Sequence, residues 1–410
     1  MIQVARKGLA GAAALAVCLL GAACSSSSTT TTTSSPTASA TSSSPSSVSV
    51  SVSVGQFNKT FAAMALLKPL TAAGHGKVAV LLPDTVSSAR YVQFDAPYLT
   101  QALTAAGLSS SDFTVQNAQG SDATQYSQAQ TAITSGASVL IFDQLDPGVG
   151  VQVENYAKAH GVAVIDYDRL TLGGSRGYYV SFNNVLVGQK IGQGFVACAT
   201  AWHVAKPNVV VMYGAPTDNN ATLFAQGYNG VLNPLFTAGS YVKVANTAGS
   251  WDAATSLSEF EQAFTAHKTI NSALVPNDAN AAPIIHYLQT QGIKAKTFPT
   301  TGQDATTIGL QNILAGYQCG SVYKPIYLEA QAAVAVAMYL RAGKTPPISL
   351  VNATTQDTKA NVAVPSVYLT PTWVTTANME QTVIADQFVK VAQLCVGQYA
   401  TLCKTYGISL

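Results

Sequence analysis

Short, uniformly apolar segments alternate with segments whose apolar residues recur at helical spacing along most of this chain. The apolar segments predict strands at 77–83, 113–116, 139–143, 162–167, 208–214, 241–245 and 272–275, with a further strand ending at 302. Helical patterns lie near 91–106, 124–135 and 149–160, and after 220, 253, 280 and 306. Strands that are apolar throughout and separated by helices are typical of a parallel sheet covered on both faces. Because the rhythm restarts near 208, we predict an α/β protein with two doubly wound lobes facing each other across a cleft.

The N-terminus has the pattern of an export signal. Arg6 and Lys7 precede an uncharged run, residues 8–23, that is too short to span a bilayer comfortably. The run ends in Gly-Ala-Ala-Cys at 21–24, which resembles the lipobox of bacterial lipoproteins, although Gly21 stands where leucine is commonest. We therefore expect residues 1–24 to be a lipoprotein signal peptide, with Cys24 lipidated and the protein anchored outside the cytoplasm. The alternative is an ordinary secretion signal that ends near a cysteine by chance.

A polar linker follows the signal. Residues 25–47 are only Ser, Thr, Pro and Ala, so they offer too little apolar surface to offset the entropy of ordering. Serine and valine alternate from Val48 to Val54 at strand spacing, but no turn or partner strand lies nearby. We predict a disordered tether over residues 25–76.

Composition and charge narrow the class of partner. The chain has 410 residues, of which 48% are hydrophobic and only 10% are charged, so it can bury a large core. Lys and Arg total 21 against 19 Asp and Glu, giving a net charge of +2. This charge is too small and too dispersed for nucleic acid to be the expected partner.

Cysteine usage agrees with an oxidising compartment. Apart from Cys24, an exported chain would retain four cysteines: Cys198, Cys319, Cys395 and Cys403. The last two are eight residues apart and are the favoured local pair, which would leave the first two to each other, but four cysteines allow three connectivities. There is no C-x-x-C motif and no histidine cluster, so we predict neither a metal site nor a cofactor.

Polar side chains follow almost every predicted strand. They are Asp84, Asp168-Arg169, Asp218-Asn219-Asn220, Asn277-Asp278, Gln303-Asp304 and Lys324. Ligands of open α/β sheets sit beyond the carboxyl ends of the strands. A sugar hydroxyl both donates and accepts, and planar carboxylate, amide and guanidinium groups can bridge two adjacent hydroxyls. Tyr91 and Trp251 could cover the apolar faces of a sugar ring. The alternative for each Asp or Asn alone is a helix N-cap.

Several of these segments together resemble one known family. They are Tyr167-Asp168-Arg169, Tyr179-Val-Ser-Phe-Asn183, Gly214-Ala-Pro-Thr-Asp-Asn-Asn-Ala-Thr-Leu-Phe224, Pro276-Asn-Asp-Ala279, Thr301-Gly-Gln-Asp-Ala305 and Val322-Tyr-Lys-Pro325. In this order they are similar to the periplasmic D-xylose-binding proteins, solute-binding proteins that feed ABC transporters. The resemblance implies the type I periplasmic binding protein fold, in which two Rossmann-like lobes joined by a three-strand hinge close on one monosaccharide.

The resemblance also implies ligand-binding positions. They are Arg90, Tyr91, Asp168, Arg169, Asp218, Asn220, Trp251, Asn277, Asp304 and Lys324. The family has tryptophan where this chain has Tyr91, and Ser-Phe-Asp where it has Ser-Phe-Asn183, which puts xylose in doubt more than sugar binding. The implied first lobe comprises 77–182 and 325–365. The second comprises 183–324 and 366–410, with a C-terminal extension that lies outside the resemblance beyond residue 372.

Enzymatic alternatives fit the pattern less well. Residues 173–177 spell G-x-S-x-G, but they lie in a predicted loop rather than between a strand and a helix as a nucleophile elbow requires. No phosphate-binding glycine motif follows the first strand. Asp218 and Asp304 could form a glycosidase pair only at a suitable separation, whereas the mixture of Arg, Lys, Asn and Asp suits hydroxyl recognition.

We therefore predict a binding protein rather than an enzyme. The expected ligand is D-xylose or a related aldopentose or aldohexose, and the expected partner is a membrane ABC permease. We expect a monomer. A sugar sensor that signals to a membrane kinase or chemoreceptor is the alternative, since one chain does not identify the partner surface.

Overall fold

The computed structural model describes residues 50–88 and 90–409. The predicted signal peptide 1–24, the lipidation site Cys24 and residues 25–49 of the predicted tether lie outside the described residues. No helix of the described chain has both the length and the apolar run needed to cross a membrane.

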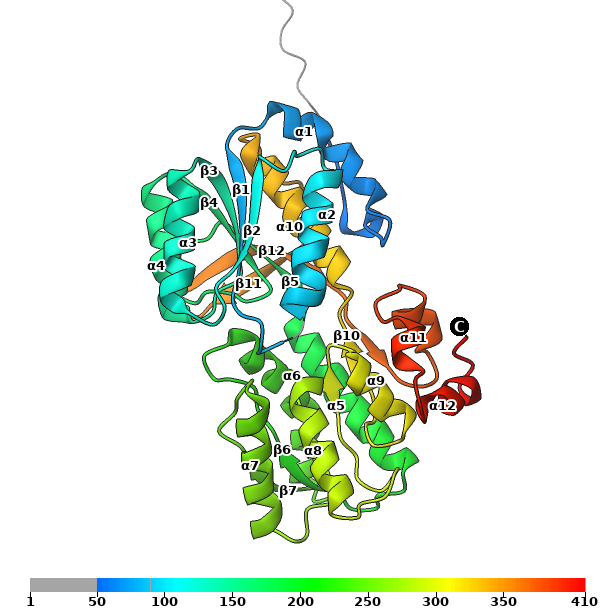
Figure 1. Ribbon diagram of the computed structural model, residues 1–410. Coiled ribbons are helices and arrows are strands. Elements are labelled where there is room, and N and C mark those ends of the chain that lie inside the picture. Colours follow the sequence, from blue (N-terminus) through cyan, green and yellow to red (C-terminus); the bar gives the residue numbers. More distant parts are fainter. Residues whose placement is uncertain (1–49, 89, 410) are drawn as a thin grey trace, which may run out of the picture. The chain divides into compact units, whose positions relative to one another are not determined.

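A seven-stranded sheet forms the centre of the first lobe (Figure 1). Its strand order is β11-β12-β5-β4-β3-β1-β2. The strands are β1 (Lys77–Leu82), β2 (Phe113–Asn117), β3 (Ala137–Phe142), β4 (Ala163–Tyr167), β5 (Tyr178–Phe182), β11 (Ala353–Asp357) and β12 (Val362–Leu369). All neighbours pair in parallel except β11 and β12, an antiparallel hairpin at the edge. The predicted strands 77–83 to 162–167 all lie in this sheet.

Helices cover both faces of this sheet because successive side chains of a strand point to opposite sides. Val78 and Val80 belong to the cluster formed with α2 (Ala96–Ala105) and α10 (Ile326–Arg341). Leu81, which directly follows Val80, points to the other face and belongs to the cluster formed with α3 (Asp122–Thr134) and α4 (Pro147–Ala159). Full burial of each such side chain contributes roughly 1.5–3 kcal/mol. Strand β1 is therefore apolar on both faces from Val78 to Leu82, as predicted.

The second lobe is built on two short sheets that a single bridge connects. The first is parallel, with order β7-β6-β8, and comprises β6 (Asn208–Val211), β7 (Val242–Asn246) and β8 (Ser272–Leu274). A parallel bridge between Ala273 and Thr300 leads to β9 (Gly302–Gln303), β10 (Ser321–Tyr323) and β13 (Thr372–Val374). One core cluster contains α5 (Asn184–Ala201), α6 (Asn219–Thr237) and α9 (Thr307–Leu314), and another contains α7 (Ala253–Ala266) and α8 (Asp278–Thr290).

The chain passes between the two lobes three times. The passages run from β5 to α5, from β10 to α10 and from β12 to β13. The first and third passages lie beside each other, because the Asn183 backbone N–H donates to the Leu369 carbonyl at 3.0 Å. The predicted two-lobed α/β fold with a three-strand hinge is confirmed. The third passage lies at 370–371 rather than 365–366, because β12 continues in the first sheet to Leu369.

The tether prediction is wrong for residues 50–76. This N-terminal segment forms the 3₁₀ turns η1 (Val54–Gln56) and η2 (Ala62–Leu67) and helix α1 (Lys68–Ala73). Its apolar side chains enter the first lobe's core: Val52, Phe57, Phe61, Met64, Leu67 and Leu70 are buried there. The Tyr339 hydroxyl of α10 also donates to the Val50 carbonyl at 2.7 Å. Buried apolar surface offsets the entropy of ordering in this segment.

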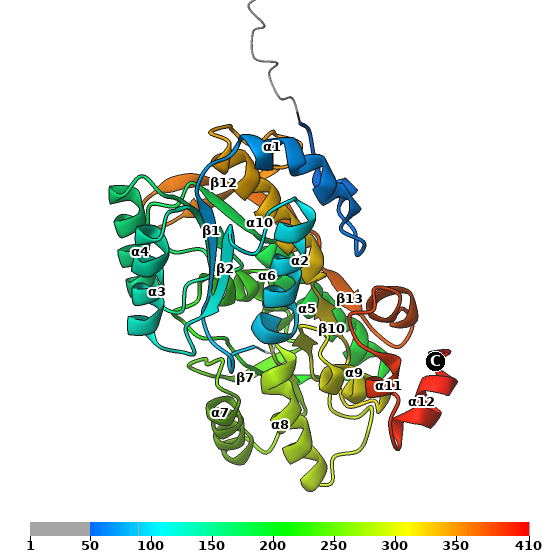
Figure 2. The ribbon, with the colours of Figure 1, turned by 45° about the horizontal axis from the view of Figure 1, so that its top comes forward.

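Two disulfides hold the four remaining cysteines. Cys198 pairs with Cys319 and Cys395 with Cys403, at Cα separations of 5.6 and 5.9 Å. Of the three connectivities, this is the one favoured by spacing. The second bond lies in the C-terminal extension, residues 375–409, which comprises η4 (Glu380–Ile384), α11 (Val391–Leu394) and α12 (Tyr399–Thr405). Figures 1 and 2 show α11 and α12 beside α9.

Candidate functional site

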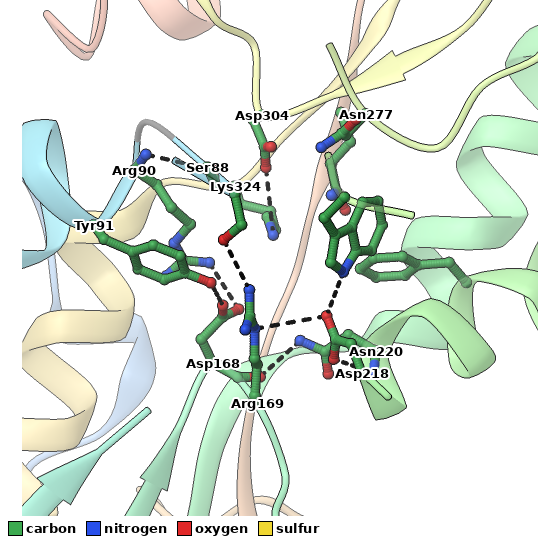
Figure 3. A pocket seen from close by; sticks show the side chains of 14 residues that line it. Ser88, Arg90, Tyr91, Asp168, Arg169, Asp218, Asn220, Asn277, Asp304 and Lys324 are labelled. Carbon is green, nitrogen blue, oxygen red and sulfur yellow. Dashed lines mark hydrogen bonds and ion pairs between the residues drawn. The ribbon is translucent and has the colours of Figure 1, made fainter. Parts of the chain in front are cut away.

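A polar pocket lies where the carboxyl ends of strands from both lobes meet (Figure 3). Its lining is Ser87, Ser88, Arg90, Tyr91, Asp168, Arg169, Asp218, Asn220, Phe224, Trp251, Asn277, Gln303, Asp304 and Lys324. The structure therefore brings all ten residues expected from the sequence to one pocket. Ser87, Ser88 and Phe224 were not expected, and Gln303 was noted only as a polar residue at a strand end.

Each missed residue is a chain neighbour of an expected one. Ser87 and Ser88 belong to the loop after β1 that leads to Arg90. Phe224 lies one helical turn beyond Asn220 on α6, so the two share a helix face. Gln303 directly precedes Asp304 at the end of β9. Helical spacing from Asn220 is the signal that could have identified Phe224.

Arg90 is held by three buried carboxylates. Its guanidinium lies 2.7 Å from Asp95, 2.8 Å from Asp168 and 2.6 Å from Glu329. Burial lowers the pKa of Arg90, but these carboxylates outweigh it and raise the pKa well above its usual value. One cation cannot balance three buried anions, and burial raises the pKa of Glu329 to about 8 even though Arg90 lowers it. Most N–H donors of Arg90 are therefore already hydrogen-bonded to protein carboxylates.

Asp168 is fixed in an unusual conformation at the centre of the pocket. Its φ is +58°, in the left-handed region that few residues other than glycine, asparagine and aspartate adopt. Its backbone carbonyl accepts hydrogen bonds from Tyr179 Oη at 2.8 Å, Ser181 Oγ at 3.0 Å and Asn220 Nδ2 at 2.9 Å. Asn220 belongs to the second lobe, so this bond joins the lobes. Burial raises the pKa of Asp168, but Arg90 and other nearby cations hold it below its usual value.

Arg169 is bound more loosely than Arg90. Its Nε lies 3.6 Å from Asp218 Oδ2, and its terminal nitrogens donate to Ser87 Oγ at 3.2 Å and to the Gln144 carbonyl at 3.4 Å. These distances are long for charge-assisted hydrogen bonds. The guanidinium also lies 5.5 Å from the centre of the Tyr91 ring. Arg169 is therefore able to donate to a ligand without first breaking a strong internal bond.

The second lobe presents helix N-caps to the pocket. One Asp218 oxygen accepts from the Asn220 backbone N–H at 2.9 Å, while the other accepts from Trp251 Nε1 at 3.0 Å. Asn277 caps α8 in the same way, accepting from the Asn280 N–H at 3.0 Å. The cap interpretation and the pocket interpretation therefore both hold for these residues. Burial raises the pKa of Asp218, and Arg169 opposes the rise.

A strained turn carries the last pair of polar groups. Asp304 has φ +90° and Ala305 has φ +48°, a conformation that persists only where the surroundings impose it. Asp304 Oδ1 lies 3.5 Å from Lys324 Nζ, which in turn lies 6.0 Å from the centre of the Phe224 ring. Beside them the buried Gln303 Oε1 accepts from no residue of the described chain. The turn thus offers both donors and acceptors to the pocket.

Asp278, behind this turn, supports it from the protein interior. It is fully buried and accepts from Thr306 N at 2.8 Å, Gln318 Nε2 at 2.8 Å and Ser321 Oγ at 2.9 Å. Burial, with Asp304 adding to the effect, raises the pKa of Asp278 to about 7.

The raised pKa of Asp278 makes stability depend on pH. The folded chain holds a proton up to about pH 7, whereas an unfolded aspartate releases it near pH 4. The contribution is therefore complete below pH 4 and is lost as pH rises to 7, at up to about 1.4 kcal/mol per pH unit. We expect Asp278→Asn to remove this slope, measured by urea unfolding between pH 4 and 8. Equal slopes in both proteins would contradict the assignment.

The residues that line the pocket have the chemistry of small-molecule recognition. Among residues 50–88 and 90–409, no three His, Cys, Asp or Glu side chains are grouped to hold a metal ion. The G-x-S-x-G spelling, residues 173–177, lies in the loop between β4 and β5 and not at a strand-to-helix turn. Donors and acceptors from both lobes face one small volume that Tyr91, Phe224 and Trp251 also line. Such a site can bind a small, hydroxyl-rich molecule.

Comparison with known proteins gives consistent matches. The family model described as "Periplasmic binding protein domain" matches residues 78–345. The D-xylose-binding periplasmic protein of Escherichia coli (strain K12) is 35% identical over 285 residues, covering 68% of this chain and 82% of that protein. The multiple sugar-binding periplasmic receptor ChvE of Rhizobium radiobacter is 30% identical over 341 residues, covering 80% and 94%.

Solved structures show the same fold. An ABC transporter solute binding protein from Clostridium phytofermentans, crystallised with β-D-glucose, superimposes with a TM-score of 0.69 at 27% identity and covers 77% of this chain and 99% of that one. A carbohydrate transporter solute binding protein from Chloroflexus aurantiacus, in complex with D-glucose, gives a TM-score of 0.68 at 26% identity, covering 77% and 97%.

Proposed function

This chain belongs to the periplasmic binding protein family, is a solute-binding protein and not an enzyme, and on that premise we propose that it captures one monosaccharide and delivers it to an ABC permease. The proposed ligand is D-xylose or a related aldopentose or aldohexose. The proposed contacts are Arg90, Tyr91, Asp168, Arg169, Asp218, Asn220, Trp251, Asn277, Asp304 and Lys324. Lipidation of Cys24 would hold the receptor at the outer face of the membrane that contains the permease.

The observation that carries this proposal is the lining of the pocket. Polar groups that donate and accept outnumber apolar ones, and they come from both lobes. The sugar-bound solved structures of the same fold support the ligand class.

Binding would work through the hinge. A sugar that contacts Arg169 of the first lobe and Asp304 of the second gains its full set of hydrogen bonds only when the lobes are closed. The ligand therefore shifts the population toward the closed form by its differential affinity for the two forms. The permease would recognise that closed form.

Titration calorimetry of the full chain in detergent solution tests the proposal. We expect one-to-one binding of one of D-xylose, D-glucose, L-arabinose, D-ribose or D-galactose, with a change in tryptophan fluorescence because Trp251 lines the pocket. No heat with any of the five, from folded protein free of co-purified sugar, would contradict the proposed ligand class.

A further inference from the structure

The C-terminal extension, residues 375–409, is anchored on the second lobe. Gln311 of α9 donates to the Leu394 carbonyl at 3.1 Å, and Val383, Leu394 and Ile408 are buried in the second lobe's core. The disulfide between Cys395 and Cys403 closes the turn between α11 and α12. The extension thus moves with α9 as part of the second lobe.

One loop of the extension, residues 385–389, nevertheless contacts the first lobe. The Phe388 ring stacks on the Phe94 ring, with centroids 3.9 Å apart and planes 13° apart. Phe94 belongs to η3 (Tyr91–Asp95), a π-helical turn at the start of α2. Tyr91, which lines the pocket, lies three residues before Phe94 in this turn, and Arg90 immediately precedes the turn. The stack therefore holds the element that carries two pocket residues.

The same loop contacts a second pocket element. Asp386 Oδ2 accepts hydrogen bonds from the hydroxyls of Tyr323 and Tyr327, both at 3.0 Å. Tyr323 ends β10 and directly precedes Lys324 of the pocket, while Tyr327 lies in the first turn of α10. Asp386 thus fixes both ends of the passage from β10 to α10. Lys59 of the N-terminal segment adds a bond of 2.5 Å from Nζ to the Ala385 carbonyl.

A cleft lies beside the stack of Phe94 on Phe388, so few other side chains support η3 on this side. Gln93 and Tyr98 of the first lobe line one side of it, and Thr306 and Gln393 of the second lobe line the other. Side chains do not fill the space between these residues. The stack of Phe94 on Phe388 consequently supplies close apolar contact between η3 and the extension at this point.

We propose that loop 385–389 is a positioning element of the ligand pocket. Phe388 holds η3, and hence Arg90 and Tyr91, in its place at the pocket, and Asp386 holds Lys324 through Tyr323. No residue of loop 385–389 lines the ligand pocket. Phe388 and Asp386 therefore act on the ligand only through the pocket residues that they position. The expected effect on sugar affinity rests on the proposed function. The effect of the loop on the mobility of η3 can be measured without a ligand.

Amide hydrogen exchange of the full chain without sugar tests the structural part. In Phe388→Ala we expect exchange of residues 91–96 to accelerate at least about tenfold, because the turn loses its stacking partner. Phe264→Ala is the matched control: Phe264 stacks on Phe260 with centroids 5.5 Å apart, entirely within the second lobe. Unchanged exchange over 91–96 in Phe388→Ala, or equal acceleration in the control, would overturn the proposal.

Sugar affinity tests the functional part, with whichever of the five sugars binds the wild type. We expect Phe388→Ala to raise Kd about 3- to 30-fold, mainly through faster dissociation, and Phe264→Ala to leave Kd within about twofold. Phe94→Ala should give a similar rise, and the double variant less than the product of the two. Independent effects, or a Kd that does not change, would overturn the positioning role.

Two further outcomes keep the proposals separate. If the wild type binds none of the sugars, the proposed function fails, and exchange over 91–96 alone decides whether the loop holds η3. If Phe388→Ala does not fold, the milder Phe388→Leu and the isosteric Asp386→Asn replace it. Their hydrogen exchange over residues 91–96 and their Kd are then compared with those of Phe264→Ala. A purely structural role would lower the melting temperature of these variants without changing the dissociation rate.

Discussion

Replacement of Arg169 by alanine is expected to raise the Kd for the sugar by about 30- to 3,000-fold, the range for truncating one member of a buried charged pair. Arg169 lies at the centre of the pocket with its side chain almost fully buried, and its contacts to Ser87 and Gln144 are long. A ligand hydroxyl can therefore take up its donors. The variant also leaves Asp218 facing the sugar without its cation. Calorimetry with the sugar that binds the wild type measures the change.

Arg90→Ala is the comparison that separates binding from stability. Arg90 closes three salt bridges to Asp95, Asp168 and Glu329, and removing one member of a buried ionic network costs about 3–5 kcal/mol. We expect this variant to lose several degrees or more of melting temperature, whereas Arg169→Ala should lose less, because its ion pairs with Asp218 and Asp143 are longer, at 3.6 and 4.0 Å. Arg169→Ala that binds sugar with unchanged Kd, while its circular dichroism is normal, would contradict the role of Arg169.

The difference between these two arginines could not be predicted from the sequence. Both follow strands of the first lobe and both were expected to contact the ligand. Glu329, which holds Arg90, lies 239 positions away on α10, and no local pattern connects them. The sequence places a residue at a strand end, but only the tertiary structure shows how many of its donors are already used.

The strands and the place of the pocket were predictable for a physical reason. Strands buried on both faces must be apolar throughout, so β1, β3 and β4 stand out against a polar background. Polar groups after such strands meet at one edge of the sheet. This is why polar residues that follow the strands, such as Asp168 and Asp304, could be expected at one pocket without a structure, whereas the full set of ten, with Arg90, was implied by the resemblance to a known family.

Helix α10 shows why other elements escaped prediction. Of its sixteen residues, Ile326 to Arg341, almost all are buried, including the alanine-rich stretch 330–337. A helix buried on every side has no polar face, and therefore no helical period for a sequence pattern to reveal. The N-terminal segment escaped for a different reason: its turns η1, η2 and α1 are three to six residues long, too short to show a period.

A chain that begins at residue 77 is expected not to fold cooperatively, whereas one that begins at residue 50 should. The segment 50–76 inserts six large apolar side chains into the core shared with α2 and α10. At roughly 1.5–3 kcal/mol for each buried side chain, their loss approaches the whole stability of a typical domain, about 5–15 kcal/mol. Thermal unfolding followed by circular dichroism distinguishes the two chains.

Leu66 and Leu67 allow the same test by point substitution. They are adjacent in η2, but Leu66 is 48% exposed and Leu67 is fully buried. We expect Leu67→Ala to lower the free energy of unfolding by about 2–5 kcal/mol, as for other buried leucines, and Leu66→Ala to change it by less than about 0.5 kcal/mol. Urea unfolding at constant pH measures both. Equal small effects would mean that the segment adds little to the core and that the tether extends to residue 76. A large effect confined to Leu67 would instead place the start of the folded domain near residue 50.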